Sequence, residues 1–351
     1  MLDLKGLTAT VIVEGQSLNY DEGFGNVSNL KKIRRGSGEI HTFSSRQSLR
    51  YSIVKIGEDQ FGWKLAPVEA KGSGGKKVTQ FKADAAIKDY EEIDLFGYMK
   101  TGDKKKKSKK SEKESGMEEE NTQTENEQTE TYTRSAPVRL TPAISLEPFY
   151  NDMEFLNNKW LADRANEDPN LANIETHRSF YKYTIAIDLD LIGVDKNGKE
   201  NEELKPEIKA RRINELLEIL KILYRDIRGR REDLKPVFLI GGVYPIKNPF
   251  FMNSVRLEWK NRKPFVPVEP LEQILKGTFS YKGNESEELK SFKAGSHTYL
   301  GFREGIFSDS LQEYAKKIPT LKGSGSPEEA IDKLKNDVEE AYGVVKVGTS
   351  S

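Results

Sequence analysis

The segment YKYTIAIDLDLIG at 181–193 constrains the fold more than any other part of the chain. Apolar side chains recur at every second position from Tyr181 to Leu191. The polar residues between them are Lys182, Thr184, Asp188 and Asp190. Because side chains alternate between the two faces of a β-strand, this pattern predicts a strand with one face on a core. We expect the polar face to be solvated; a metal site at the two aspartates is the alternative.

Other segments carry strand or helix periodicity. Strands are predicted at 7–13, 236–244 and 254–260, and 136–147 is predicted to form an interrupted strand or a hairpin arm. Helices are predicted from Ser44 or Ser45, over 205–228 with Gly229 as its end, and from Ser326. With one strand inside an insertion, the order is β-α-β-β-α-β. That order is typical of an α+β ferredoxin-like (RRM-like) fold, a common RNA-binding scaffold, although a fold alone implies no function.

The segment 101–135 differs in composition from the rest of the chain. A lysine-rich block is followed by an acidic block, and Met117 and Tyr132 are its only sizeable apolar residues. Such a segment buries too little apolar surface to offset the entropy of ordering, so we predict a disordered linker. The lysines could instead bind RNA, but the acidic block that follows cancels their charge.

The balanced composition gives the protein no net charge, so it has no electrostatic field of a single sign over its whole surface. Lys plus Arg number 56 and Asp plus Glu number 56, so any signal for nucleic acid or membrane must be local. The chain contains no cysteine, which excludes disulfides and thiolate zinc sites and favours a reducing cytosol. No signal peptide is expected at the start, and no apolar run approaches the roughly 20 residues of a membrane helix.

The motifs of common enzyme classes do not emerge from the sequence. GSGGKKV at 72–78 has the wrong glycine spacing for a phosphate-binding loop, and no GxSxG motif is present. His41, His177 and His297 are scattered, so a surface or satisfied-core role is expected for each. We therefore expect no catalytic residue, no cofactor and no metal.

Donor-rich residues gather just before and at the first predicted helix. Between positions 31 and 50 the only acid is Glu39, whereas the cations are Lys31, Lys32, Arg34, Arg35, Arg46 and Arg50. Ser44, Ser45 and Gln47 add short donors at a helix N-terminus, which itself favours anions. Arginine forks and hydroxyl groups suit phosphate and ribose, so the pattern predicts a clamp for a nucleic-acid backbone. A capped amphipathic helix with solvated arginines is the alternative.

Four stretches resemble one family. They are SLNYDEGFGNVSNLKKIRRGSGEIHTFSSRQSLRYSI at 17–53, EEIDLFGYM at 91–99, SFYKYTIAIDLDLIG at 179–193 and GGVYPIKNPFF at 241–251. In this order they resemble the backbone subunit (Cas family seven) of the type I CRISPR surveillance complex, Cascade. The branch is the DevR-type autoregulator branch of type I-B systems. One departure is Arg46, which separates the serine pair from Gln47 and leaves two registers, one residue apart, open for the individual contacts.

The resemblance implies a hand-shaped subunit. Its RRM-like palm would comprise 1–57 and 180–351, its fingers insertion 58–147 with the linker 101–135, and its thumb hairpin 148–179. Copies of such a subunit polymerise along a CRISPR guide RNA, and pairing of the guide with a target DNA strand supplies sequence recognition. Capping and large subunits of Cascade would be further partners.

The resemblance also assigns roles to single residues. The RNA-binding residues would be Asn19, Lys31, Lys32, Arg34, Arg35, Ser44, Ser45, Arg46, Gln47 and Arg50. Candidate wedges between bases are Phe149, Tyr150, Met153 and Phe155 in the thumb. Alternatively, these four side chains pack a small core of the thumb.

Two other functions remain open at this point. Related backbone subunits of type III systems cleave target RNA with an aspartate in an early loop, and Asp21 is the residue placed to imitate it. Such a metal-dependent enzyme is the first alternative. A DNA-binding autoregulator is the second, although we find no helix-turn-helix signature.

Overall fold

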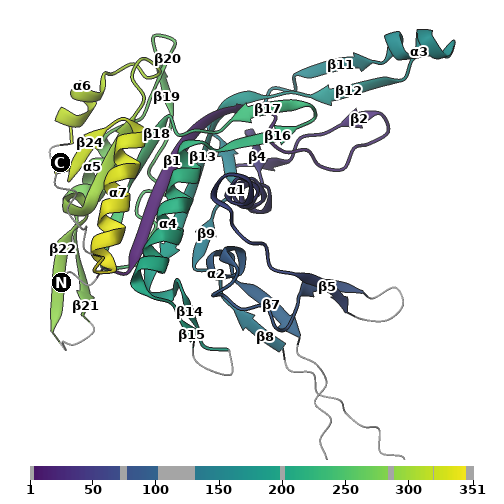
Figure 1. Ribbon diagram of the computed structural model, residues 1–351. Coiled ribbons are helices and arrows are strands. Elements are labelled where there is room, and N and C mark those ends of the chain that lie inside the picture. The colour runs from purple at the N-terminus through teal and green to yellow at the C-terminus, as the bar shows by residue number, and fades with distance from the viewer. Residues whose placement is uncertain are drawn as a thin grey trace, which may run out of the picture.

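The computed structural model describes residues 4–71, 77–101, 131–197, 202–283, 288–318 and 320–344. Within these ranges, nine strands form one sheet in an α+β arrangement (Figure 1). Eight follow one another across it in the order β24 (Gly323–Gly325), β23 (Thr298–Phe302), β18 (Phe238–Tyr244), β1 (Gly6–Gln16), β13 (Arg178–Asp188), β10 (Ala143–Ser145), β4 (Ile40–Ser44) and β3 (Lys32–Arg34). The ninth, β9 (Val138–Leu140), pairs with β13 beside β10. The interrupted strand predicted at 136–147 is thus confirmed as two short strands.

The two longest strands form the centre of the sheet. β1 and β13 pair antiparallel over their whole length, from Gly6 opposite Asp188 to Gln16 opposite Arg178. The predicted strand of 181–193 is confirmed up to Asp188, after which the chain enters a short 3₁₀ turn, η1 (Leu189–Leu191).

Three helices cover one face of this sheet: α1 (Arg46–Phe61), α4 (Pro206–Lys221) and α7 (Pro327–Ala341) (Figure 1). The predicted apolar side of α1 is buried, with Leu49 and Ile53 in the same core as Val11 and Tyr183. Ser326 caps α7 as predicted, in a reciprocal capping box.

The opposite face of β13 is covered, so the prediction of a solvated face is wrong. A second core of Ile12, Phe180, Phe238 and other apolar residues lies there, closed by α5 (Glu269–Lys276), α6 (Leu311–Lys316) and their flanking loops. Thr184 is buried and bonds to Thr10 (Oγ1 to Oγ1, 2.9 Å). The sequence near 181–193 cannot reveal this cover, because a distant C-terminal segment supplies it.

The same face carries the two aspartates. Asp188 is buried and pairs with Arg139 (Oδ2 to Nη1, 2.7 Å), whereas Asp190 remains exposed. Lys247 Nζ lies 3.7 Å from Asp188 Oδ2 and 2.5 Å from Asp190 Oδ1. The ammonium group of Lys247 therefore bridges Asp188 and Asp190, the two carboxylates that would have to bind the ion in the alternative metal site.

The helix predicted over 205–228 is shorter than expected. α4 ends at Lys221, and the chain forms a hairpin of β16 (Tyr224–Ile227) and β17 (Arg230–Asp233). Arg228 and Gly229, both at positive φ, form its turn, as two-residue hairpin loops require. Gly229 is a turn residue and not a helix end. Of the strand predicted at 254–260, only β19 (Glu258–Lys260) forms, paired with β20 (Lys263–Phe265).

The insertion after α1 contains the hairpin β5 (Val68–Lys71) and β6 (Val78–Phe81), α2 (Glu91–Phe96), and the hairpin β7 (Tyr98–Thr101) and β8 (Thr131–Arg134). Position 58, its predicted start, lies within α1. The predicted linker 101–135 is wrong at Thr101 and over 131–134, which are paired strands; 102–130 lie outside the described residues.

One buried carboxylate fastens the insertion to the sheet. Asp94 of α2 is fully buried and pairs with Arg134 of β8 (2.8 Å) and Arg212 of α4 (2.7 Å). Asp94 Oδ1 also accepts a hydrogen bond from the Gly193 backbone N–H at 2.8 Å. Charges in such a place persist only when they are paired and hydrogen-bonded.

An arm projects away from the sheet (Figure 1). It consists of β11 (Met153–Asn157), α3 (Lys159–Ala165) and β12 (Leu171–Glu175), and β2 (Val27–Ser28) pairs alongside β12. The remaining elements are the hairpins β14 (Val194–Asp195) with β15 (Glu202–Glu203) and β21 (Thr278–Lys282) with β22 (Leu289–Lys293), and the 3₁₀ turn η2 (Ala294–His297). No helix in the described ranges is long and apolar enough to cross a membrane.

Candidate nucleic-acid interface

The start of α1 is built from short polar side chains that bond to one another. Ser45 is the N-cap residue, and its Oγ accepts a hydrogen bond from the Ser48 backbone N–H at 3.2 Å. Asn19 Nδ2 donates to the same Oγ at 3.2 Å. Ser44 is fully buried, with its Oγ 2.8 Å from Ser48 Oγ. The structure therefore brings Asn19, Ser44 and Ser45 together, with Ser44 enclosed behind the cap.

The first turn of α1 presents two polar side chains to solvent. Arg46 and Gln47 are exposed, and no acidic residue occupies this turn. The positive end of the helix dipole lies at the same place. This end of the helix therefore favours an anion through both its side chains and its backbone.

Arg50 has a different environment from Arg46. Its Nη2 pairs with Glu92 Oε1 at 3.2 Å, and its guanidinium lies 5.0 Å from the centre of the Phe96 ring. Burial lowers the pKa of Arg50, and the charge of Glu92 opposes that effect. Arg50 thus joins α1 to α2 of the insertion, a partnership that the sequence pattern did not reveal.

The basic run continues from α1 along the edge strand β3. β3 pairs with β4, and β4 ends at Ser44, immediately before the cap of α1. Lys31 pairs with Asp21 at 2.9 Å, and Lys32 pairs with Glu175 at 2.6 Å. We name Lys31, Lys32, Arg34, Arg35 and Arg46 the cationic strip.

Three members of the strip keep an uncompensated charge. Arg34 Nη1 donates to the Gly38 carbonyl at 3.0 Å, and no carboxylate in the described part of the chain pairs with its charge. Arg35 and Arg46 are exposed, and no carboxylate within the described ranges pairs with either. The strip therefore keeps net positive charge at Arg34, Arg35 and Arg46.

The four predicted wedge residues do not share one environment. Phe149 is only 7% exposed and packs its ring against His177, so it presents little surface to a base. Tyr150 is 80% exposed and Phe155 58%, and Met153 is also exposed. Met153 and Phe155 lie on β11 of the arm, Tyr150 lies in the segment that leads into it, and Phe149 packs at its root.

Sequence reasoning missed two further groups of residues, one at the tip of the arm and one on the β16–β17 hairpin. Trp160 and Leu161 of α3 are exposed at the tip of the arm. The signal in the sequence was this pair of large apolar residues within the otherwise polar and small segment KWLADRA. The β16–β17 hairpin brings Arg225, whose Nε donates to the Leu18 carbonyl at 2.8 Å, and Arg228, which stacks 4.1 Å from the centre of the Tyr20 ring. The four arginines of YRDIRGRRED were the signal, hidden by the helical periodicity around them.

A buried polar network supports the root of the arm. Thr42 Oγ1 lies 2.8 Å from His177 Nδ1 and 2.9 Å from Tyr181 Oη, and His41 Nδ1 lies 2.8 Å from the Ser145 carbonyl oxygen. Burial lowers the pKa of His177. His41, His177 and His297 are all buried, which confirms the satisfied-core role.

Asp21, the candidate for RNA cleavage, is an exposed residue of the early loop. A hydrogen bond from Lys31 is the main reason that the pKa of Asp21 is lowered. Within the described ranges, no three His, Cys, Asp or Glu side chains gather so that they could hold a metal ion.

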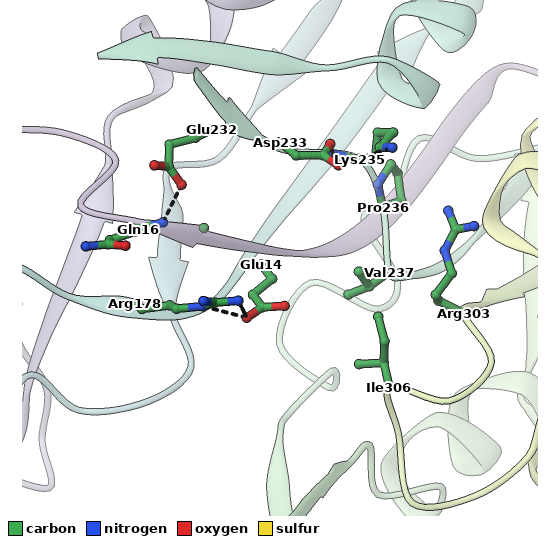
Figure 2. A pocket seen from close by; sticks show the side chains of 11 residues that line it. Glu14, Gln16, Arg178, Glu232, Asp233, Lys235, Pro236, Val237, Arg303 and Ile306 are labelled. Atoms are coloured by element: carbon green, nitrogen blue, oxygen red, sulfur yellow. Dashed lines mark hydrogen bonds and ion pairs between the residues drawn. The ribbon is translucent and has the colours of Figure 1, made fainter. Parts of the chain in front are cut away.

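A charged cleft of about 440 Å³ lies at the end of β1 (Figure 2). Its carboxylates already have partners, since Glu14 pairs with Arg178 at 2.8 Å and Glu232 accepts a hydrogen bond from the Gln16 backbone N–H at 3.0 Å. Asp233, Lys235 and Arg303 complete the charged lining, which includes no residue predicted to bind RNA.

These features define an α+β sheet protein with a cationic strip at the root of a projecting arm, a surface that suits phosphate groups. The profile of the CRISPR-associated negative auto-regulator DevR/Csa2 family matches residues 7–261. The chain belongs to this family, which confirms the resemblance found in the sequence.

Solved structures give two further comparisons. A chain described as "CRISPR RNA-guided surveillance complex, pre-nicking" is 10% identical, with 95% of this chain and 100% of that chain covered and a TM-score of 0.54. A second, described as "CRISPR RNA-guided surveillance complex", is 12% identical, with 95% and 99% covered and a TM-score of 0.49. The first comparison shows a shared fold. No curated protein matches the chain.

Proposed function

We propose that this protein is a non-catalytic backbone subunit that binds the guide RNA of a type I Cascade complex. The observation that carries the proposal is the cationic strip, which runs along β3 to the first turn of α1 at the root of an exposed arm. Membership of the DevR/Csa2 family supports it. In this function Lys, Arg and Ser side chains contact phosphate and ribose, and sequence recognition comes from pairing of the guide with target DNA.

We assign the centre of the sheet to a ferredoxin-like palm. The order β18–β1–β13–β10 supports the assignment, as do α1 and α4, which follow β1 and β13 along the chain. The insertion between α1 and β9 corresponds to the fingers, and the arm to the thumb. On this assignment the strip lies where the palm meets the thumb.

The exposed apolar residues of the arm are proposed to act between bases. Apolar side chains inserted into a base stack offset part of the lost stacking. Tyr150, Met153 and Phe155 are exposed enough for this role, and Phe149 is not. Repeated copies along one RNA would then interrupt the stack at regular intervals.

A DNA-binding autoregulator is the second candidate, because the description of the family includes negative auto-regulation. The two functions differ in their ligand. A guide-binding subunit holds RNA of one size and binds single strands, whereas an autoregulator binds a specific DNA duplex in the absence of RNA.

The test is purification of the protein from cells that also carry its neighbouring genes and a CRISPR array. We expect bound RNA of discrete length, protected from nuclease at regular steps. The variant Arg35→Ala/Arg46→Ala should carry much less RNA. Its control, Arg211→Ala/Lys316→Ala, removes two exposed cations from α4 and α6 and should carry the normal amount. RNA-free protein that binds one duplex specifically would refute the proposal.

A further inference from the structure

We propose that the β19–β20 hairpin is a second contact for single-stranded nucleic acid, with Trp259 against a base and the cations around it on phosphates. The inference rests on the proposed function, because the bound strand is the one held by the cationic strip. It adds a site outside the residues that the sequence pattern singled out.

The hairpin combines positive charge with an exposed aromatic ring. Between positions 256 and 263 the cations are Arg256, Lys260, Arg262 and Lys263, and Glu258 is the only acid. All of them are exposed, and within the described ranges no carboxylate pairs with these four cations. Trp259 is 51% exposed, while its ring packs 6.5 Å from that of Phe180. Aromatic rings beside cations are the usual means of binding single strands without sequence preference.

The pairing of the hairpin places like charges together. Lys260 lies directly opposite Lys263, so their ammonium groups share one face and repel each other. The turn adds a further cation, Arg262. This residue has a positive φ, a conformation for which hairpin loops ordinarily use glycine. A bound phosphate would relieve this repulsion.

The hairpin is also continuous with the cationic strip. Lys182 of β13 donates hydrogen bonds to the carbonyls of Met252 and Val255, in the segment that leads into β19. Burial, followed by the positive charges of Arg35 and Arg256, lowers the pKa of Lys182 to about 8. Arg35 of the strip and Arg256 beside the hairpin therefore both lie close enough for their charges to act on Lys182.

The shape of the hairpin allows one strand to contact both of its faces. Because neighbouring residues point to opposite faces, Trp259 and Lys260 lie on different sides of the ribbon. The ribbon is only two strands wide, and it extends from the end of the sheet at which the arm also leaves (Figure 1). A strand that crosses its edge can place a base on Trp259 and the next phosphates on the lysines.

The test uses the purified full-length protein and an oligouridylate probe, with affinity measured by fluorescence anisotropy across a salt series. Lys260→Ala/Lys263→Ala should flatten the dependence of log affinity on log salt by about 1.4, since each single-strand phosphate contact contributes about 0.7. Lys282→Ala/Lys316→Ala, which removes two exposed lysines elsewhere, should leave the slope unchanged.

A second readout follows Trp259 without removing it. In a Trp160→Phe background the remaining indoles are Trp259 and the buried Trp63, so oligouridylate should quench the emission of Trp259. An unchanged slope together with absent quenching would overturn the hairpin site. If Arg35→Ala/Arg46→Ala still lost affinity, the proposed function would stand; if no variant changed affinity, both would fail. Loss of self-association with normal RNA affinity in the lysine variant would assign the hairpin to a protein contact and overturn the inference.

Discussion

Arg46 and Arg50 lie one helical turn apart, and the structure predicts opposite consequences when each is replaced by alanine. Arg46 is exposed without a carboxylate partner in the described ranges, whereas Arg50 pairs with Glu92 and stacks on Phe96. Loss of one phosphate contact on a single strand reduces the slope of log affinity against log salt by about 0.7. Between 50 and 200 mM salt this slope corresponds to a factor of about 2.6 in affinity.

Arg46→Ala should therefore flatten the salt dependence by about 0.7 and leave the free energy of unfolding within about 0.5 kcal/mol of wild type. Arg50→Ala should keep the slope but lower the free energy of unfolding by about 1–2 kcal/mol, because it removes a half-buried ion pair and a cation–π contact. Binding is measured with a labelled oligouridylate at five salt concentrations, and stability by urea denaturation. Equal slope changes in the two variants would refute the distinction drawn from the Glu92 contact.

Three further perturbations test other parts of the molecule. Asp94→Asn leaves Arg134 without a countercharge and Arg212 with only the 3.6 Å contact to Glu91, and should lower the free energy of unfolding by about 3–5 kcal/mol in urea titrations; a loss below 1 kcal/mol would contradict the buried pairing. The pKa of Lys182 falls from 10.5 to about 8 on folding, so the unfolded chain binds more protons between those pH values. Stability relative to Lys182→Met should then rise by up to about 3 kcal/mol from pH 8 to 10.5, and a flat difference would refute this. Phe149→Ala should cost about 3–5 kcal/mol of stability, whereas Phe155→Ala should cost under about 1 kcal/mol yet change the nuclease protection pattern of bound RNA; matching stability losses would contradict their different burial.

The sequence predicted the elements whose signals are local. Alternation over 181–188 and the serine cap at Ser45 both depend on residues within a few positions of each other, and the structure confirms them. The same holds for Ser326, where proline and glutamate in the first turn complete the cap. Local geometry fixes such features before any tertiary contact forms.

The errors arose where hydrophobic periodicity alone determined the prediction. The apolar side chains of Leu223 and Ile227 continue the period of α4, yet Arg228 and Gly229 favour a two-residue turn and the chain reverses. The polar face of β13 was expected in solvent, but two segments distant in sequence, one around Phe251 and one around Tyr314, cover it. Periodicity states which side chains share a face, and it does not state what packs there.

The candidate site shows the same division. The sequence identified the cations between positions 31 and 50, because six of them occur within twenty positions beside one acid. It could not identify their counterions, since Lys32 pairs with Glu175 from the arm and Arg50 with Glu92 from the insertion. Because those carboxylates are 143 and 42 positions away, only the folded chain separates the cations that hold the protein together from those available to a phosphate. We therefore expect Arg34, Arg35 and Arg46 to be available to a phosphate. Lys31 instead pairs with Asp21 of the early loop, and Lys32 pairs with Glu175 of the arm.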